Sequence, residues 1–119
     1  MTALKNGAIT EAKLKELKPE IDNWKKKHGE IVQLTIDLDE NEVFEGIFSI
    51  PSESDINLST RKELSELEQQ KQLSRLCVLY PDAIAFDGII TKYWGMAIPI
   101  SSKLINLAHI TKQATVKKL

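Results

Sequence analysis

The residues that decide the fold class are IVQLTIDL (31–38), DEN (39–41) and EVFEGIFSI (42–50). In the first run, apolar side chains alternate with polar ones, which is the period of two typical of a half-buried strand. The alternating apolar residues are Val32, Leu34, Ile36 and Leu38. The polar run Asp39-Glu40-Asn41 that follows predicts a turn.

A second strand is predicted after this turn. Phe44, Phe48 and Ile50 share one face of it, Glu42 and Gly46 are the exceptions in that register, and Pro51 ends it. Together the two runs predict an antiparallel hairpin over residues 30–50. Because an isolated hairpin is marginal in water, its apolar face must pack on helices.

Upstream of the hairpin, a helix is predicted after a loose leader over residues 1–9. Thr10 is suited to cap it, and Gly29 is suited to close it after the basic run Lys25-Lys26-Lys27-His28. Pro19 lies inside the pattern and predicts either a kink or a restart. The residues that recur on one helical face are Leu14, Leu17, Ile21 and Trp24.

Downstream of the hairpin, residues 51–58 are polar and predict a surface loop. Ser59 or Thr60 is expected to cap the next helix, with Glu63 at the capping-box spacing from Thr60. Pro81 is expected to end that helix. Its apolar residues are Leu64, Leu67, Leu73, Leu76 and Tyr80.

Two further helices are predicted after Pro81. Pro81-Asp82 start a short helix, a break follows near Gly95, and a last helix starts around Pro99 or Ser101. Their apolar residues are Ile84, Phe86, Ile89 and Ile90, then Leu104, Leu107, Ala108 and Ala114. We therefore predict an α+β fold with an N-terminal helix, an antiparallel β-hairpin and three helices packed on it. It forms a single domain over residues 1–119, with its helical part at 59–118.

Charge and cysteine content exclude several functional classes. The 119 residues include 16 basic and 17 acidic side chains, so no long-range field favours nucleic acid or an anionic membrane. The one cysteine, Cys77, permits no intrachain disulfide and favours a reducing compartment. We see no apolar signal segment and no run long enough to span a membrane, so the expected location is the cytoplasm.

The residue types needed for catalysis do not gather in the sequence. Asp37, Asp39 and Asn41 copy the first ligands of a calcium loop, but Glu42 and Phe48 occupy the positions that require Gly and Glu. The two histidines, His28 and His109, have no ligand or nucleophile partner at a suitable spacing. Cys77 is expected to be a small buried hydrophobe. We predict no catalytic residue, no metal site and no cofactor, and hence a protein that is not an enzyme.

The cluster Tyr93-Trp94-Gly95-Met96 is the most interface-like part of the chain. Trp, Tyr and Met are enriched where proteins bind one another, so Tyr93, Trp94 and Met96 are the candidate partner-binding residues. The competing interpretation places Trp94 in the core, where it anchors the last two helices. Partner binding and a core position of Trp94 are both possible if the cluster forms the edge of a groove.

Over roughly residues 20–119, the chain resembles a group of small bacteriophage proteins that are encoded among tail genes and described as tail-assembly-chaperone-like. The resemblance lies in the Lys-rich helix ending near Gly29, the hairpin running into Pro51, and several C-terminal runs. These runs are Leu79-Tyr80-Pro81-Asp82, Tyr93-Trp94-Gly95-Met96-Ala97, Ile98–Ile110 and Val116-Lys117-Lys118-Leu119. The chain departs from the group at residues 82–87 and at Trp94, so no binding residue is transferred from it.

The resemblance implies a phage or prophage protein without catalysis. Proteins of this group are thought to coat the helical tape-measure protein until the tail tube polymerises around it. Amphipathic helices and a hairpin suit helix-in-groove binding, and exposed apolar faces favour a homo-oligomer when the client is absent. The alternative is a small regulatory or adaptor protein that binds another host or phage protein.

Overall fold

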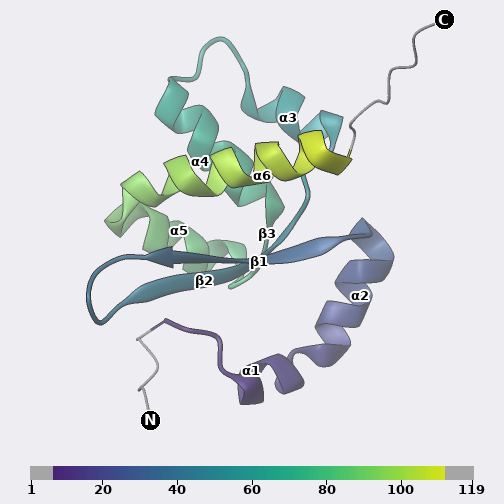
Figure 1. Ribbon diagram of the computed structural model, residues 1–119. Coiled ribbons are helices and arrows are strands. Elements are labelled where there is room, and N and C mark those ends of the chain that lie inside the picture. The colour runs from purple at the N-terminus through teal and green to yellow at the C-terminus, as the bar shows by residue number, and fades with distance from the viewer. Residues whose placement is uncertain (1–6, 112–119) are drawn as a thin grey trace, which may run out of the picture.

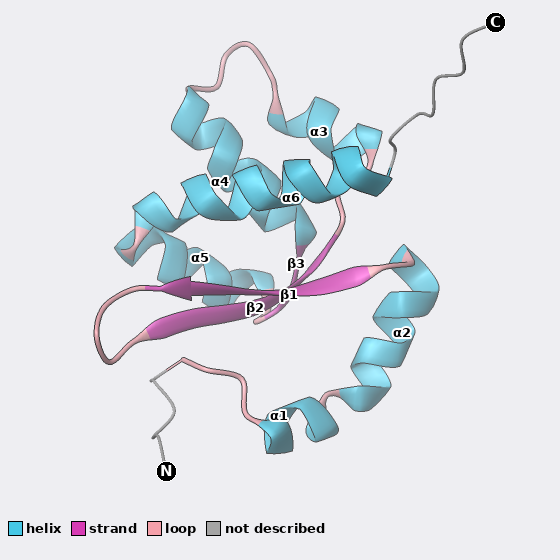
Figure 2. Cartoon of the chain, viewed as in Figure 1, coloured by secondary structure: helices cyan, strands magenta, loops and turns pink. Residues whose placement is uncertain are grey.

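The computed structural model describes residues 7–111 of the chain, without the side chains of residues 109–111. Helices α1 and α2 lie on one side of a small sheet, and helices α3 to α6 lie on the other (Figures 1 and 2). A short 3-10 helix, η1, leads into α6. The elements are α1 (Glu11–Glu16), α2 (Lys18–His28), β1 (Ile31–Asp37), β2 (Val43–Ser49), α3 (Glu53–Ser59), α4 (Glu66–Cys77), β3 (Val78–Tyr80), α5 (Ala83–Lys92), η1 (Trp94–Met96) and α6 (Ala97–Thr111). The predicted α+β fold, with a hairpin followed by helices, is confirmed.

The sheet has the order β1-β2-β3, and both pairs of neighbours are antiparallel. The hairpin register runs without interruption from Ile31 opposite Ser49 to Asp37 opposite Val43. The predicted turn is confirmed, because Asp39 Oδ1 accepts the N–H groups of Asn41 and Glu42 at 2.7 and 2.8 Å. In the order β1-β2-β3, strand β1 forms one edge of the sheet.

The main core lies between the sheet and helices α4 to α6. Three phenylalanines meet at its centre, where Phe86 of α5 lies 5.7 Å from Phe44 and 6.0 Å from Phe48 of β2, measured between ring centroids. Burying each ring stabilises the fold by about 1.5–3 kcal/mol, and the contacts between the rings add to this. The other buried members of this cluster are Leu34, Leu73, Cys77, Ile90, Met96, Ala97, Ile100 and Leu104.

Helices α1 and α2 pack less tightly than the C-terminal helices, and neither contains a buried residue. Thr10 caps α1 by accepting the N–H of Lys13 at 3.1 Å, and Gly29 closes α2 with a φ of 79°, both as predicted. Pro19 lies at the start of α2, so the proline restarts the helix. The leader reaches the sheet at Ile9, whose N–H donates to Glu45 Oε1 at 2.9 Å.

The loop predicted for residues 51–58 is wrong, because Glu53–Ser59 form helix α3. Ser52 and Asp55 make a reciprocal capping box at its start, with bonds of 3.0 and 3.2 Å. The predicted cap of the following helix is also wrong, since Thr60 ends α3. Helix α4 starts at a second capping box formed by Ser65 and Glu68.

The predicted helix running to Tyr80 is wrong at its C-terminal end. Helix α4 ends at Cys77, and Val78–Tyr80 form strand β3, in which Tyr80 lies opposite Ile47 of β2. Pairing with β2 satisfies backbone groups that one more helical turn would have satisfied locally. Leu76, predicted for the apolar face of α4, is exposed.

The two final helices lie close to their predicted positions. Asp82 caps α5, and α6 starts at Ala97, slightly before the predicted Pro99 or Ser101. The predictions made for residues 1–6 of the leader, for Ala114 and for the terminal residues 116–119 lie outside the described residues, and so does the side chain of His109.

Candidate partner-binding surface

The bend between α5 and α6 places the three candidate residues in three different environments. Tyr93 ends α5, and its N–H donates to Ile89 O at 2.9 Å. Its half-buried side chain points to the hairpin, where the hydroxyl donates to Glu42 Oε2 at 2.7 Å. Tyr93 therefore links the bend to the hairpin, across 51 residues of sequence.

Met96 and Trp94 lie on opposite sides of the bend. Met96 is only 4% exposed and belongs to the core cluster, so it supports the surface from beneath and is inaccessible to a partner. Trp94 is 55% exposed. The interpretation of Trp94 as a core anchor is therefore wrong, and of the three candidate residues this is the one that presents a large apolar side chain to solvent.

Trp94 begins a row of exposed apolar side chains along η1 and α6. Ile98 follows four residues later at 48% exposure, and Ile105 follows seven residues after that at 37%. A spacing of seven places Ile98 and Ile105 on one face of α6, and Trp94 lies on η1, just before the start of that helix. We call Trp94, Ile98 and Ile105 the α6 row. Ile98 and Ile105 were not among the predicted partner-binding residues, although their spacing from Trp94 is visible in the sequence.

A groove of about 400 Å³ lies between α6 and the helices α3 and α4, and Ile98 and Ile105 of the α6 row line it. Its base includes two buried serines whose hydroxyls are already bonded within their own helices. Ser59 Oγ donates to Ile56 O at 2.9 Å, and Ser101 Oγ donates to Ile98 O at 3.2 Å. An apolar side chain can therefore cover them without leaving a polar group unpaired. The other lining residues are Thr60, Glu66, Gln69, Gln70, Ile98, Ser102, Ile105 and Asn106.

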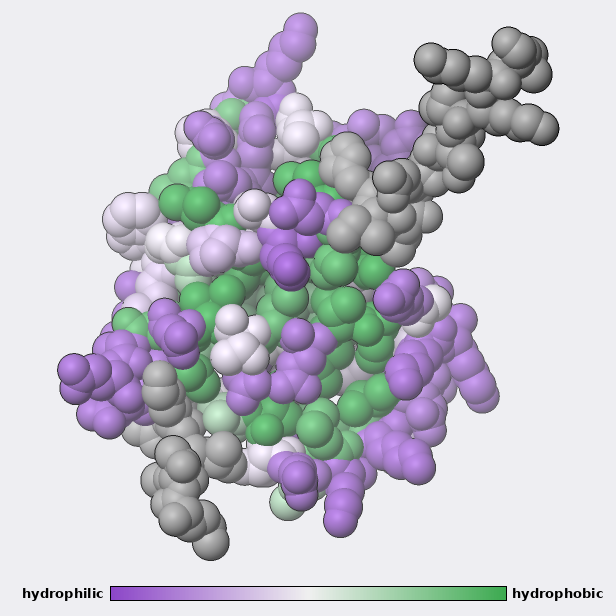
Figure 3. All heavy atoms as spheres, in the orientation of Figure 1, coloured by the Kyte–Doolittle hydropathy of each residue, from purple (hydrophilic) through white to green (hydrophobic). Residues whose placement is uncertain are grey.

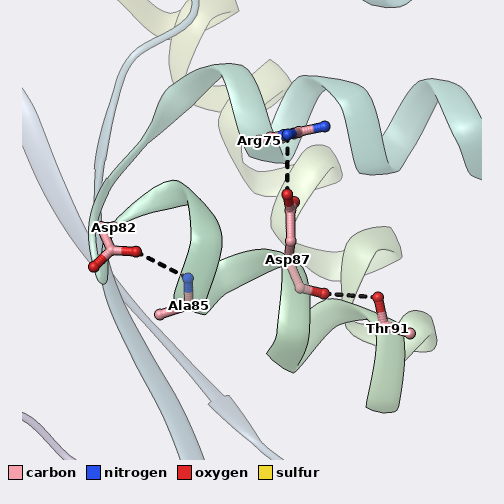
Figure 4. Close-up of polar contacts among 5 residues, drawn as sticks. All are labelled: Arg75, Asp82, Ala85, Asp87 and Thr91. Carbon is pink, nitrogen blue, oxygen red and sulfur yellow. Dashed lines mark hydrogen bonds and ion pairs between the residues drawn. The ribbon is translucent and has the colours of Figure 1, made fainter.

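A charged cluster between α4 and α5 has a structural role (Figure 4). Arg75 Nη2 lies 3.0 Å from Asp87 Oδ2, and Thr91 Oγ1 donates to the backbone oxygen of Asp87 at 2.7 Å. Asp82 accepts the N–H of Ala85 at 2.9 Å and so caps α5. These contacts join or terminate helices.

The described residues contain no group of three His, Cys, Asp or Glu side chains that could hold a metal ion. Cys77 is fully buried, as predicted. Burial, together with the negative charge of Asp55, raises the pKa of the Cys77 thiol to about 12, although a hydrogen bond with Ser49 opposes the shift. At neutral pH the sulfur is therefore protonated and is a poor nucleophile.

Thiol labelling checks this assignment of Cys77. We expect the folded protein to react with a disulfide reagent at neutral pH at least about 100-fold more slowly than the urea-unfolded chain, because only an exposed thiolate reacts. The rate is measured by absorbance with and without urea. Equal rates in the two samples would contradict the buried, protonated thiol.

Comparisons with known proteins inform the fold. No family model matches the chain, and no curated protein matches it. The chain is similar to a solved structure of an uncharacterised protein from Bacillus stearothermophilus, with a TM-score of 0.59 and 22% identity. The match covers 83% of this chain and 98% of the other. At this level of identity, the likeness shows the fold alone.

Of the helices within residues 7–111, none combines the length and the apolar character that crossing a membrane requires.

Proposed function

We propose that this protein acts without catalysis, by binding an amphipathic helix of another polypeptide along the α6 row and the neighbouring groove. The observation that carries the proposal is the exposure of Trp94 on η1 and of Ile98 and Ile105 on α6. Binding hot spots are commonly large, partly rigid apolar side chains beside a groove that a partner can fill.

The geometry suits a helical client. A helix carrying apolar residues at the same spacings can lie against the α6 row and bury those residues in the groove. Gln69, Gln70 and Asn106 place amides around the groove, which provides the polar rim found at reversible interfaces. Among the described residues, Glu66 is the only charged one that lines the groove, so we expect an apolar stripe flanked by polar and basic side chains on the client.

The proposed client is the tape-measure protein of a phage tail, because the sequence resembles tail-assembly-chaperone-like proteins. A tape-measure protein is long and helical, and covering its apolar stripe keeps it from aggregating. A tape-measure gene beside the gene for this protein would support this client, whereas a regulatory operon would favour the adaptor alternative.

Replacing Trp94 with alanine is expected to weaken binding to a coexpressed tape-measure fragment by about tenfold or more, because Trp at an interface is often a hot spot. The thermal midpoint should change little, since the side chain is 55% exposed. Affinity is measured by isothermal titration, and folding is measured by circular dichroism.

The matched control is Ile84→Ala, which removes another exposed apolar side chain, 86% exposed, from α5. It should leave affinity unchanged, because residue 84 is not part of the α6 row or the groove. If Trp94→Ala and Ile84→Ala bind as tightly as the native protein, the α6 row is not the docking surface. If no tape-measure fragment binds the folded native protein, the client is wrong.

A further inference from the structure

Within residues 7–111, no strand pairs with the outer edge of β1. Leu38 N donates to Glu42 O at 3.0 Å, which fixes the alternation of the hairpin hydrogen bonds. In an antiparallel pair, this alternation directs the backbone groups of Val32, Leu34 and Ile36 to β2 and those of Gln33 and Thr35 outward. Within residues 7–111, no segment offers a hydrogen-bond partner to the outward N–H of Gln33 or Thr35.

Strand β1 lacks several of the features by which proteins protect an exposed edge, and Asp37 at its end is the only charged residue in it. The strand is seven residues long, its register with β2 has no bulge, and it contains neither Pro nor Lys. In Figure 1, β1 runs across the front of the molecule between α6 and α2. Figure 3 shows hydrophobic residues gathered over the middle of this face. A regular edge of this kind is a template for another strand.

Pairing of β1 with β1 of a second copy sets polar side chains opposite polar ones and apolar side chains opposite apolar ones. An antiparallel pair centred on Leu34 sets Gln33 opposite Thr35 of the second copy, and it sets Val32 opposite Ile36. Val32 and Ile36 are half-buried and pack against the core cluster, so each would gain an apolar cross-strand neighbour. Gln33 and Thr35 are exposed on the other face, where both side chains donate to Glu45 of their own copy, at 2.7 and 2.9 Å, so pairing leaves their polar groups bonded.

The charges at the two ends of β1 favour the same arrangement. The exposed run Lys25-Lys26-Lys27-His28 ends α2, just before β1. The acidic turn containing Asp39 and Glu40 follows β1, and residues 31–50 include no basic side chain. Antiparallel pairing brings the basic end of each copy towards the acidic turn of the other, so this attraction occurs twice, and the three lysines outnumber the single acid Glu30 that lies between α2 and β1.

We propose that two copies of this chain form a dimer by pairing β1 with β1 about a two-fold axis at Leu34, which produces one continuous six-stranded sheet. The inference is independent of the proposed client binding, because it uses the edge of β1 and none of the α6 row. A closed two-fold pairing also removes the exposed edge, so no further strand can add to it.

The test is Thr35→Pro, with Thr35→Val as its matched control. Proline removes the outward N–H of residue 35 but none of the β1–β2 hydrogen bonds, and edge strands tolerate it. Both variants lose the hydroxyl that donates to Glu45 at 2.9 Å. By sedimentation, the native protein and Thr35→Val should show about twice the monomer mass of 13.4 kDa, and Thr35→Pro should show the monomer mass. A native monomer at high micromolar concentration, or a dimeric Thr35→Pro, would overturn the proposal.

A cross-linking experiment tests the register of the β1–β1 pair even if Thr35→Pro fails to fold. Opposed residues of a hydrogen-bonded antiparallel pair have Cα atoms about 5.5 Å apart, which a disulfide can span. Gln33→Cys chains mixed with Thr35→Cys chains should therefore form a disulfide dimer under mild oxidation, well above the yield of either variant alone. Cys77 is fully buried and should contribute no background. Equal yields from the mixture and the single variants would contradict the register.

Discussion

Replacing Phe86 with alanine is expected to lower the free energy of unfolding by about 3–5 kcal/mol. The Phe86 ring is fully buried, and it joins α5 to the sheet by packing 5.7 Å from Phe44 and 6.0 Å from Phe48. Alanine would remove the transfer free energy of the ring, both aromatic contacts and the atoms that fill the centre of the core. Urea denaturation followed by circular dichroism measures the change.

Ile84→Ala is the control within the same helix. The Ile84 side chain is 86% exposed, so its loss should change the free energy of unfolding by no more than about 0.5 kcal/mol. A loss below about 1 kcal/mol for Phe86→Ala would mean that the three phenylalanines do not form the centre of the core. The same Ile84→Ala variant serves as the binding control for Trp94, which allows stability and affinity to be compared in one series.

Elements whose signals are local could be predicted from the sequence. The hairpin follows from the alternation in Val32–Leu38 and from the turn residues Asp39–Asn41, which bond within the turn itself. The start of α5 follows from Asp82, a helix cap that acts within three residues. In each case, neighbouring residues supply the deciding interactions, so a single sequence contains the information.

Two elements were not predicted from the sequence. One forms by pairing with a distant strand, and the other starts at a helix cap that was not recognised. Val78–Tyr80 continue the apolar pattern of α4, and they become a strand because β2, about 30 residues earlier, offers a free edge. Helix α3 is short and polar, and the prediction of a loop overlooked the capping box of Ser52 and Asp55. Its signal was present in the sequence, unlike that of β3.

The accessibility of the candidate surface depends on the directions of the side chains at residues 93–96, which the sequence does not determine. The cluster at residues 93–96 was identified from its residue types, but the 3-10 turn decides which side chain points outward. Tyr93 turns to Glu42, Met96 turns into the core and Trp94 turns to solvent.

Gly46→Ala is expected to lower the free energy of unfolding by about 2–3 kcal/mol, even though it adds only a methyl group. A Cβ at residue 46 would lie 2.7 Å from Phe44 Cζ, 2.9 Å from Phe48 Cε1 and 2.9 Å from Tyr80 O. Phe44 and Phe48 lie on the same face of β2, two residues to either side. They are held by Phe86, while Tyr80 O belongs to the paired strand β3. None of these atoms can withdraw without disturbing the core or the sheet.

The matched control is Gly88→Ala in α5, where nothing lies within 4 Å of the added Cβ. Alanine there should raise the free energy of unfolding by about 0.5–1 kcal/mol, because glycine is a poor helix former. The same chemical change thus has opposite signs at the two positions, and urea denaturation of both variants measures the difference. Stabilisation by both substitutions would mean that the rings and the β3 carbonyl do not close over Gly46. It would also remove the reason for this glycine to interrupt the apolar face of β2.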